Sequence, residues 1–320
     1  MKYNRRKFLG CSAFAGAAVS AGWLGFSQQR AARWLRRIIA DTGRNVLPAT
    51  VKPDLAKWSD NAVTICWIGH ATVLINFYGI RILTDPTLGD RCGVALGIGT
   101  AGPKRFVAPA LRLRELPPID LVLLSHAHMD HMDLASLGTF VGKTAIVAAT
   151  KTTDLLANAR AKPPTELGWG DDFTLKTDRG ELRVEAFEVN HWGKRWPNEE
   201  IGRGYNGYIL RREGRALIFA GDTANTPLFG NLRPRGPFDA AIMPIGAYDP
   251  WIRSHCTPEQ AVEMATAAGA SYIVPVHHQT FKLSDEPMSE PIERIQTALQ
   301  HEPERLALKQ IGESFIVPKV

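Results

Sequence analysis

The amino-acid sequence predicts an α/β fold in which two β-sheets pack face to face and are flanked by helices. Short apolar segments rich in β-branched residues form two groups, one in each half of the chain, and segments with helical patterning alternate with them. The 320 residues are enough for one large domain or two small ones. Because the sequence shows no internal repeat and no low-complexity linker, one domain is the simpler interpretation.

The first half is expected to open with three consecutive strands. Residues 63–68, 72–77 and 80–84 are apolar, and Tyr78-Gly79 suits a hairpin turn. The Gly/Pro-rich segment 85–118 then follows, and because it is longer than a plain connection we expect it to cover a site. Beyond it we expect strands at 119–124 and 145–149 and helices at 134–141 and 153–161.

The second half repeats this alternation of strands and helices. Its apolar runs are again short, and two longer segments carry the helical period. The expected strands cover 182–189, 207–211, 216–220, 239–243 and 272–276, and the expected helices cover 258–268 and 290–300.

The net charge of +6 is concentrated near the start of the chain. Residues 1–52 hold ten Lys/Arg and one acidic residue, which leaves 28 basic and 31 acidic residues for the remainder. A nucleic-acid-binding surface needs clustered positive charge on the folded domain. The mildly acidic body therefore argues against nucleic acid as a partner.

Residues 1–26 are organised like an export signal. The positively charged start Met1–Lys7 precedes the uncharged, Ala/Gly-rich stretch Phe8–Phe26. The segment Asn4-Arg5-Arg6-Lys7-Phe8-Leu9-Gly10 resembles the twin-arginine signal, and Val19-Ser20-Ala21 would suit a signal peptidase. Such a signal implies the twin-arginine export machinery as a partner and a periplasmic or membrane-associated location. The uncharged stretch is also long enough to be an uncleaved membrane anchor.

Residues 27–60 are expected to lead into the main domain at 61–320. Within them, segment 27–52 predicts a basic amphipathic helix, because four arginines are spaced among apolar side chains. Such a helix either makes a peripheral contact with an anionic membrane surface or packs on the body. The arginines are Arg30, Arg33, Arg36 and Arg37, and the apolar residues are Trp34, Leu35, Ile38 and Ile39.

The densest cluster of chemically active side chains follows the strand expected at 119–124. It contains three histidines and a carboxylate, His126, His128, Asp130 and His131. A strand that ends in these groups is a poor way to build an apolar core, because each must be hydrogen-bonded or ligated once it leaves water. Imidazole and carboxylate together are suited to a borderline metal such as zinc.

Four later positions add similar groups at the ends of expected elements. His191 and Asp222 follow strands, His255 precedes the helix at 258–268, and His277 follows the last strand. Either His191 or Asp222 alone would more often be a structural hydrogen-bonding residue. Together they favour an active site, because α/β architectures assemble their sites from loops at strand ends.

The ordered set His126-x-His128-x-Asp130-His131, His191, Asp222 and His277 resembles the metallo-β-lactamase fold superfamily of binuclear hydrolases. The resemblance covers about residues 62–317. Five further motifs resemble the N-acylphosphatidylethanolamine-hydrolysing phospholipase D-like family. These are Trp67-Ile68-Gly69-His70-Ala71-Thr72, Leu83-Thr84-Asp85-Pro86, Met243-Pro244-Ile245-Gly246-Ala247-Tyr248, His255-x-x-Pro258-Glu259-x-Ala261 and Pro275-Val276-His277-x-x-Thr280-Phe281.

The resemblance implies an αβ/βα four-layer sandwich with two zinc ions per chain. One zinc would be held by His126, His128 and His191, the other by Asp130, His131 and His277, with Asp222 between them. Asp130 would also orient the nucleophile. His70 and His255 would either contact the substrate's phosphate or leaving group or support the ligands. Asp85 would be a supporting or turn residue, while His278 and His301 stand outside the metal set.

The resemblance further implies a zinc-dependent phosphodiesterase of phospholipase D type acting on N-acylphosphatidylethanolamine or a related phospholipid. The same metal chemistry attacks carbonyl carbon, so a lactonase or other acyl hydrolase with a small-molecule ester substrate is the alternative. A non-catalytic binding protein would have no need of the full ligand set. Apolar residues of segment 85–118 would either hold an acyl chain or pack under a lid; they are Val94, Leu96, Ile98, Phe106, Val107 and Leu111.

Overall fold

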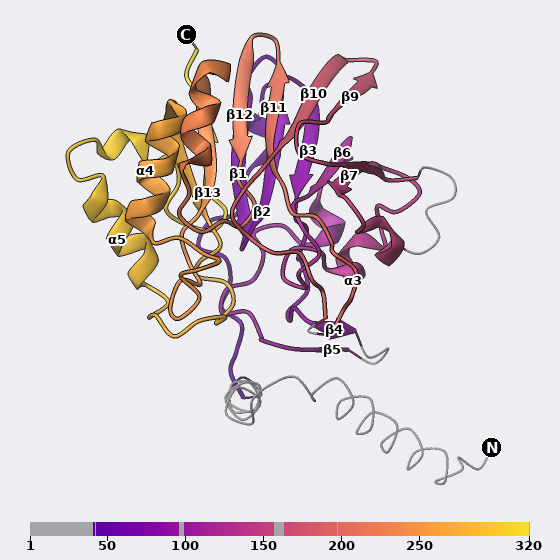
Figure 1. The fold of residues 1–320 in the computed structure, drawn as a ribbon, viewed down its shortest axis with the longest axis vertical. Helices are drawn as coiled ribbons and strands as arrows, with labels where there is room; N and C mark the ends of the chain where they lie inside the picture. The colour runs from indigo at the N-terminus through magenta and orange to yellow at the C-terminus, as the bar shows by residue number, and fades with distance from the viewer. Residues whose placement is uncertain (1–40, 42, 96–98, 157–162, 197, 320) are drawn as a thin grey trace.

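Two large β-sheets form the centre of the protein, with helices outside them (Figure 1). The computed structural model describes residue 41 and residues 43–95, 99–156, 163–196 and 198–319. The export-signal segment and the arginine-rich part of segment 27–52 lie outside the described residues. The predicted α/β class with two sheets is confirmed.

The first sheet has seven strands in the order β15-β1-β2-β3-β6-β7-β8. Its first members pair antiparallel, while β3, β6, β7 and β8 run parallel. β1 is buried along its whole length, which explains why its sequence is a continuous apolar run without alternation. The strands are β1 Val63–Gly69, β2 Thr72–Phe77, β3 Ile80–Thr84, β6 Leu121–Leu124, β7 Ala145–Ala149, β8 Thr165–Leu167 and β15 Ser314–Ile316.

The second sheet has six strands in the order β14-β13-β12-β11-β10-β9. β9 to β12 form an antiparallel series, and β12, β13 and β14 run parallel. The strands are β9 Asp172–Thr177, β10 Gly180–Phe187, β11 Gly207–Arg212, β12 Arg215–Phe219, β13 Phe238–Pro244 and β14 Ala270–Val276. A small hairpin, β4 Val94–Ala95 with β5 Thr100–Ala101, lies within segment 85–118.

Among the described residues from 43 onward, the α-helices are α3 Leu134–Leu137, α4 Pro258–Ala268 and α5 Glu290–Ala298. The 3₁₀ turns of the same residues are η1 Leu55–Lys57, η2 Leu113–Glu115, η3 Thr153–Leu155, η4 Pro227–Arg235 and η5 Pro303–Arg305. The ends of α4 are fixed by its sequence. Thr257 and Gln260 form a capping box, and Gly269 ends the helix in the left-handed conformation. α4 therefore begins and ends where its pattern predicts.

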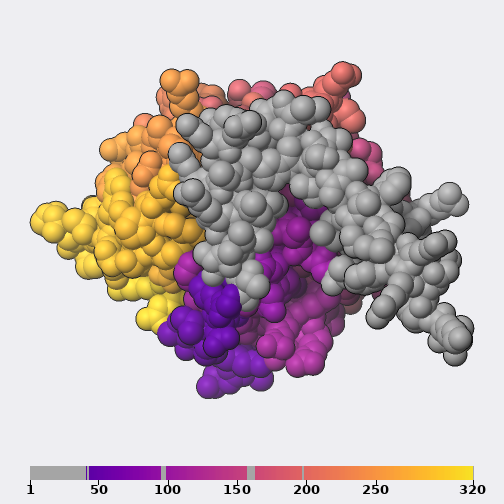
Figure 2. Space-filling model, turned by 90° about the horizontal axis from the view of Figure 1, so that it is seen from below, coloured from indigo at the N-terminus to yellow at the C-terminus, as the bar shows by residue number. Residues whose placement is uncertain are grey.

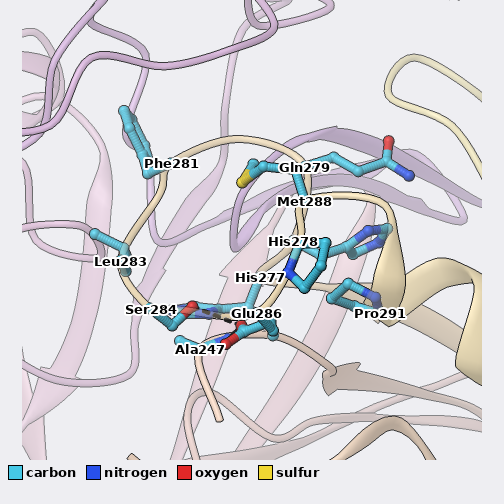
Figure 3. Close-up of a pocket in the computed structure, with 12 residues that line it drawn as sticks. Ala247, His277, His278, Gln279, Phe281, Leu283, Ser284, Glu286, Met288 and Pro291 are labelled. Atoms are coloured by element: carbon cyan, nitrogen blue, oxygen red, sulfur yellow. Dashed lines mark hydrogen bonds between the residues drawn. The ribbon is translucent and has the colours of Figure 1, made fainter. Parts of the chain in front are cut away.

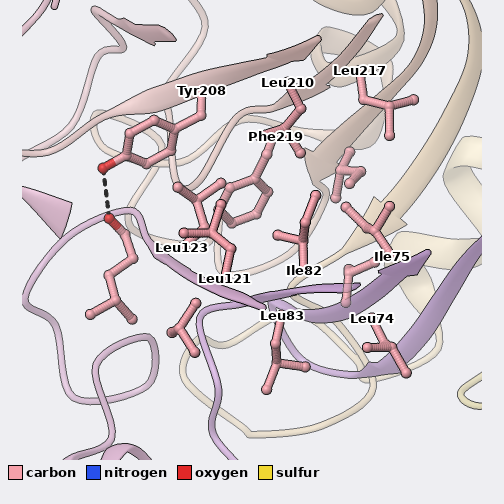
Figure 4. Packing of buried hydrophobic residues seen from close by; sticks show 14 of the residues in the cluster. Leu74, Ile75, Ile82, Leu83, Leu121, Leu123, Tyr208, Leu210, Leu217 and Phe219 are labelled. Atoms are coloured by element: carbon pink, nitrogen blue, oxygen red, sulfur yellow. Dashed lines mark hydrogen bonds between the residues drawn. The ribbon is translucent and has the colours of Figure 1, made fainter. Parts of the chain in front are cut away.

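Side chains from both sheets meet in the main core. Figure 4 shows Ile75 and Ile82 of the first sheet facing Leu217 and Phe219 of the second. The buried hydroxyl of Tyr208 donates to the carbonyl of Leu124 at 2.8 Å. A second core lies between the second sheet and the helices α4 and α5. These two cores hold the strand ends in place.

Two expected helices are wrong in length or type. The helix expected at 134–141 ends at Leu137, where Gly138 has low helix propensity and turns follow. The helix expected at 153–161 begins instead as the 3₁₀ turn η3, Thr153–Leu155, and its residues 157–161 lie outside the described residues. At the start of η3, the carboxylate of Glu166 in β8 accepts hydrogen bonds from the amides of residues 151–153. These amides therefore bond to a neighbouring strand and not to a helix-capping residue of their own segment.

The helix expected over 27–52 is not helical from residue 43 onward. Leu47 forms a parallel bridge with Val107, and the Leu47 amide donates to the Phe106 carbonyl at 2.8 Å. This part of the chain therefore packs on the body, and Figure 2 shows it in indigo between the yellow C-terminal and the magenta segments. Within the described ranges, no helix is both long and apolar enough to cross a membrane.

Candidate metal centre

The ends of five strands bring the predicted site residues together. His70 follows β1, the cluster His126–His131 follows β6, His191 follows β10, Asp222 follows β12 and His277 follows β14. His255 comes from the loop between β13 and α4. Because these strands lie in two packed sheets, residues up to about 200 positions apart in the sequence meet at one end of the sandwich.

One group of possible ligand atoms comprises His126, His128, His191 and Asp222, with one atom of each within 4.8 Å of the others. His128 Nδ1 lies 2.8 Å from His126 Nε2 and 3.2 Å from His191 Nε2. Asp222 Oδ2 lies 3.9 Å from both His126 Nε2 and His191 Nε2. The sequence cluster and two distant residues thus form one compact group.

A second group comprises His70, Asp130, His131 and His277. Asp130 Oδ2 lies 2.9 Å from His70 Nε2 and 3.3 Å from His277 Nε2. Asp222 Oδ2 reaches this group too, at 3.0 Å from His131 Nε2 and 3.3 Å from His277 Nε2. Asp222 therefore faces both groups.

The donors fit a metal ion. Several buried nitrogen and oxygen atoms in the two groups have no hydrogen-bond partner within the described structure, and a buried polar atom in that state is costly unless it is ligated. Imidazole nitrogen and carboxylate oxygen are also the atom types that bind zinc. In the two groups these atoms are Nδ1 of His70, Nε2 of His128, Nε2 of His131, Oδ1 of Asp222 and both ring nitrogens of His277, and beside them lies Nδ1 of His255.

The electrostatics of the centre favour a cation. Burial, together with neighbouring imidazoles, holds the pKa of His126 well below its usual value, so this ring is neutral. Burial opposes ionisation of Asp222, but His131 and His277 outweigh it and hold the pKa of Asp222 well below the usual range. Burial would also lower the pKa of His277, yet Asp222 and Asp130 raise it to about 9. The neutral ring of His126, the ionised carboxylate of Asp222 and the attraction of positive charge to His277 all favour binding of a metal cation.

Buried acceptors orient two of the histidines. Asp85 accepts hydrogen bonds from the Ser125 amide at 2.8 Å, from the Ser125 hydroxyl at 2.5 Å, and from His131 Nδ1 at 2.7 Å. The Ser254 carbonyl accepts from His191 Nδ1 at 2.8 Å. In each case the other nitrogen, Nε2, faces the centre, which is the arrangement that partners of metal-binding histidines impose. The sequence left open whether Asp85 is a supporting or a turn residue, and its contact with His131 makes it a supporting residue.

His70 and His255 lie at the centre as expected, in different surroundings. The backbone of His70 is fixed by a hydrogen bond from its amide to the Thr280 hydroxyl at 2.7 Å. Its Nε2 contacts Asp130. His255 Nδ1 lies 3.8 Å from Asp222 Oδ2 and has no hydrogen-bond partner among the described residues. Burial lowers the pKa of each imidazole to about 3.

His278 lies outside the two groups. Its ring stacks on Trp67 with centroids 4.4 Å apart, and it lines a small pocket with Ser284 and Glu286 (Figure 3). Glu286 accepts hydrogen bonds from the Ala247 amide and the Ser284 hydroxyl, which ties this pocket to the backbone beside His277. The exclusion of His278 from the predicted ligand set agrees with this placement.

Sequence reasoning missed residues that shape the centre. Trp192 packs against His128 with ring centroids 4.1 Å apart, and Arg195 donates to the carbonyls of Ala127 and Met132. In the sequence, the one feature that could have pointed to Trp192 and Arg195 is that they follow the predicted ligand His191. In segment 85–118, Leu111 is buried in the main core and Phe106 lies under the Arg44 guanidinium at 3.7 Å, so these two residues serve packing.

Known proteins share this sequence pattern and fold. Residues 80–278 match the beta-lactamase superfamily domain. An uncharacterized protein of Mycobacterium tuberculosis is 31% identical over 82% of this chain and 70% of its own length. The N-acyl-phosphatidylethanolamine-hydrolyzing phospholipase D 1 of Caenorhabditis elegans is 29% identical over 70% of this chain and 66% of its own length. The structure of an isothiocyanate hydrolase from Delia radicum gut bacteria superposes with a TM-score of 0.61 at 17% identity, covering 79% of this chain and 98% of that one.

Proposed function

Because this chain belongs to the beta-lactamase superfamily and is a metal-dependent hydrolase of the metallo-β-lactamase fold, we propose that it is a phosphodiesterase of phospholipase D type. Its substrate is N-acylphosphatidylethanolamine or a related phospholipid. The observation that carries the proposal is the pair of ligand groups that share Asp222 Oδ2. The likeness to a phospholipase D supports the substrate class.

The two groups are assigned to two zinc ions. His126, His128 and His191 would hold one, Asp130, His131 and His277 would hold the other, and Asp222 faces both groups. Bound zinc would supply a water nucleophile at neutral pH and offset negative charge at phosphorus. The protein's own contribution is to fix the imidazole tautomers through Asp85 and the Ser254 carbonyl, and to exclude water through burial.

His255 is assigned the substrate contact. Its Nδ1 is buried close to Asp222 and makes no hydrogen bond to the described residues, so it is available to a phosphate or leaving-group oxygen. Asp130 is assigned the orientation of the nucleophile, since its Oδ2 faces three imidazoles. His70, which contacts Asp130 from the buried side, holds that carboxylate in place.

A side-by-side assay of zinc-loaded protein tests the proposal. The substrates are a phosphodiester lipid in mixed micelles, a soluble aryl phosphodiester, a simple lactone and a β-lactam. We expect phosphodiester cleavage, and a loss of about 10²–10³-fold in His255→Ala, the range typical of removing one hydrogen-bond donor from the charge that develops in the transition state. His301→Ala is the matched control, because His301 is exposed. Fast lactone turnover without phosphodiester cleavage would overturn the proposal in favour of an acyl hydrolase.

We also propose that the enzyme acts after export by the twin-arginine machinery, in the periplasm or at a membrane. The support is the segment Asn4–Gly10.

A further inference from the structure

Two loops beside the candidate metal centre expose large apolar side chains. In one loop Trp192 is 47% exposed and Trp196 is 45% exposed. In the other, Trp251 is 40% exposed and Ile252 is 45% exposed. We call these four residues the tryptophan rim. Large apolar residues that gather on a surface mark sites of protein or membrane contact.

The two loops are joined to each other and to the centre. His191 Nδ1 donates to the Ser254 carbonyl at 2.8 Å, which links the start of one loop to the end of the other. Trp192 packs on the ring of His128. The Trp251 carbonyl accepts from the amides of Ser254 at 2.8 Å and His255 at 3.0 Å. The rim is therefore built on the same backbone that positions His191 and His255.

The charges within the rim indicate which surface it fits. Lys194 and Arg253 are exposed cations in the two loops, and Glu200 and Asp249 are exposed acidic residues in or directly beside them. The positive and negative charges balance, which complements a zwitterionic headgroup layer better than an anionic one. Tryptophan is suited to such a layer, because it combines a large apolar ring with a polar N–H at the boundary between lipid and water. The N–H of Trp251 donates to the Leu283 carbonyl at 3.3 Å, so this residue offers its apolar ring.

Resting on the proposed function, in which the substrate is a phospholipid, we propose that the tryptophan rim docks on the surface of a zwitterionic phospholipid bilayer. Docking brings the headgroup layer to the edge of the metal centre, so that a lipid reaches His255 without leaving the membrane completely. The rim residues come from other parts of the sequence than the basic N-terminal segment, and the rim acts through apolar contact.

Hydrogen–deuterium exchange of the full chain, with and without phosphatidylcholine vesicles, locates the contact whether or not the N-terminal segment also binds lipid. We expect vesicles to slow exchange about twofold or more in peptides that cover 191–196 and 249–255, and to leave peptides of β15 unchanged. Unchanged exchange in both rim peptides would overturn the inference. Protection of the rim that appears at high protein concentration without vesicles would also overturn it, and would indicate a contact between protein molecules.

A matched pair of substitutions tests the apolar contribution. Ile252→Ser removes an apolar side chain from the rim, and Ile316→Ser removes one that is 59% exposed on β15. Ile316 pairs with Thr64, at the end of β1 remote from His70. We expect Ile252→Ser to weaken vesicle partitioning roughly fivefold, and Ile316→Ser to leave it unchanged. Equal effects of the two substitutions on vesicle partitioning would contradict the proposal that the tryptophan rim contacts the bilayer.

These binding measurements need no turnover, so they separate the inference from the proposed function. Rim protection in a protein that cleaves no phosphodiester supports the inference and removes the proposed function. Cleavage of a soluble phosphodiester without rim protection keeps the proposed function and overturns the inference. We further expect partitioning through the rim to change less than twofold between about 0.1 and 0.5 M salt, since the rim charges balance.

Discussion

Replacing Asp85 by asparagine should weaken metal binding at His131 while leaving the protein folded. Asp85 is fully buried at the end of β3, and its two carboxylate oxygens accept three hydrogen bonds. Burial raises the pKa of Asp85, although the hydrogen bonds from His131 and Ser125 oppose this. Asparagine has nearly the same shape, so the substitution changes hydrogen-bonding capacity and charge with little change in packing.

The contacts show why either orientation of the amide fails. Oδ1 accepts from the Ser125 amide, while Oδ2 accepts from the Ser125 hydroxyl and from His131 Nδ1. An amide nitrogen in place of Oδ1 would face the Ser125 N–H, so two donors would oppose each other. An amide nitrogen in place of Oδ2 would require His131 Nδ1 to accept. The imidazole proton would then move to Nε2, the atom that lies 3.0 Å from Asp222 Oδ2 and is assigned to the metal.

Loss of such a supporting partner typically lowers metal affinity about 10–100-fold, equivalent to about 1.4–2.7 kcal/mol. We expect this loss in Asp85→Asn, measured by competition for zinc with a chromophoric chelator. The matched control is Asp239→Asn, because Asp239 also accepts from a backbone amide, that of Ala216 at 2.9 Å, but near the start of β13. A zinc affinity of Asp85→Asn within twofold of the native protein would refute the reasoning.

Three further predictions concern the site and export. In Gly246→Ala the new Cβ would lie 2.3 Å from the His277 carbonyl oxygen, so the His277 backbone should shift and zinc content should fall towards one ion per chain, as read by elemental analysis. Asp222→Ala should abolish turnover and lower zinc content while the far-ultraviolet circular dichroism stays native, since Asp222 faces both ligand groups. Replacing Arg5 and Arg6 together by lysine keeps the charge but removes the paired planar guanidinium groups, and should slow the appearance of protein in the periplasm in a fractionation experiment.

Each of these has a control or a contrary outcome. Gly230→Ala is the control for Gly246, because a Cβ at Gly230 meets nothing within 4 Å. Native protein that holds less than one metal per chain after zinc reconstitution would contradict the assignment of Asp222 and its neighbours as ligands. Arrival of the double-lysine variant in the periplasm at the normal rate would contradict the twin-arginine interpretation.

Strands and helices with a strong local pattern could be predicted from the sequence. β1 to β3 are apolar and nearly all buried, so strand propensity and burial agree there. In α4 the sequence supplies both capping residues, Thr257 at the N-terminus and Gly269 at the C-terminus. β9 and β15 escaped prediction because they are edge strands. β9 buries only Leu175 and alternates it with polar residues, so its conformation depends on pairing with β10.

The residues that could form the centre were predictable from the sequence, because histidines and carboxylates at the ends of apolar strands have few other uses. How these residues are arranged follows from the packing of the two sheets. That packing placed Asp85 on His131, the Ser254 carbonyl on His191, and Trp192 on the ring of His128. The physical reason is that burial and backbone propensity are set by neighbours along the chain, whereas hydrogen-bond partners and exposed surfaces are set by segments far apart that the packing of two sheets brings together.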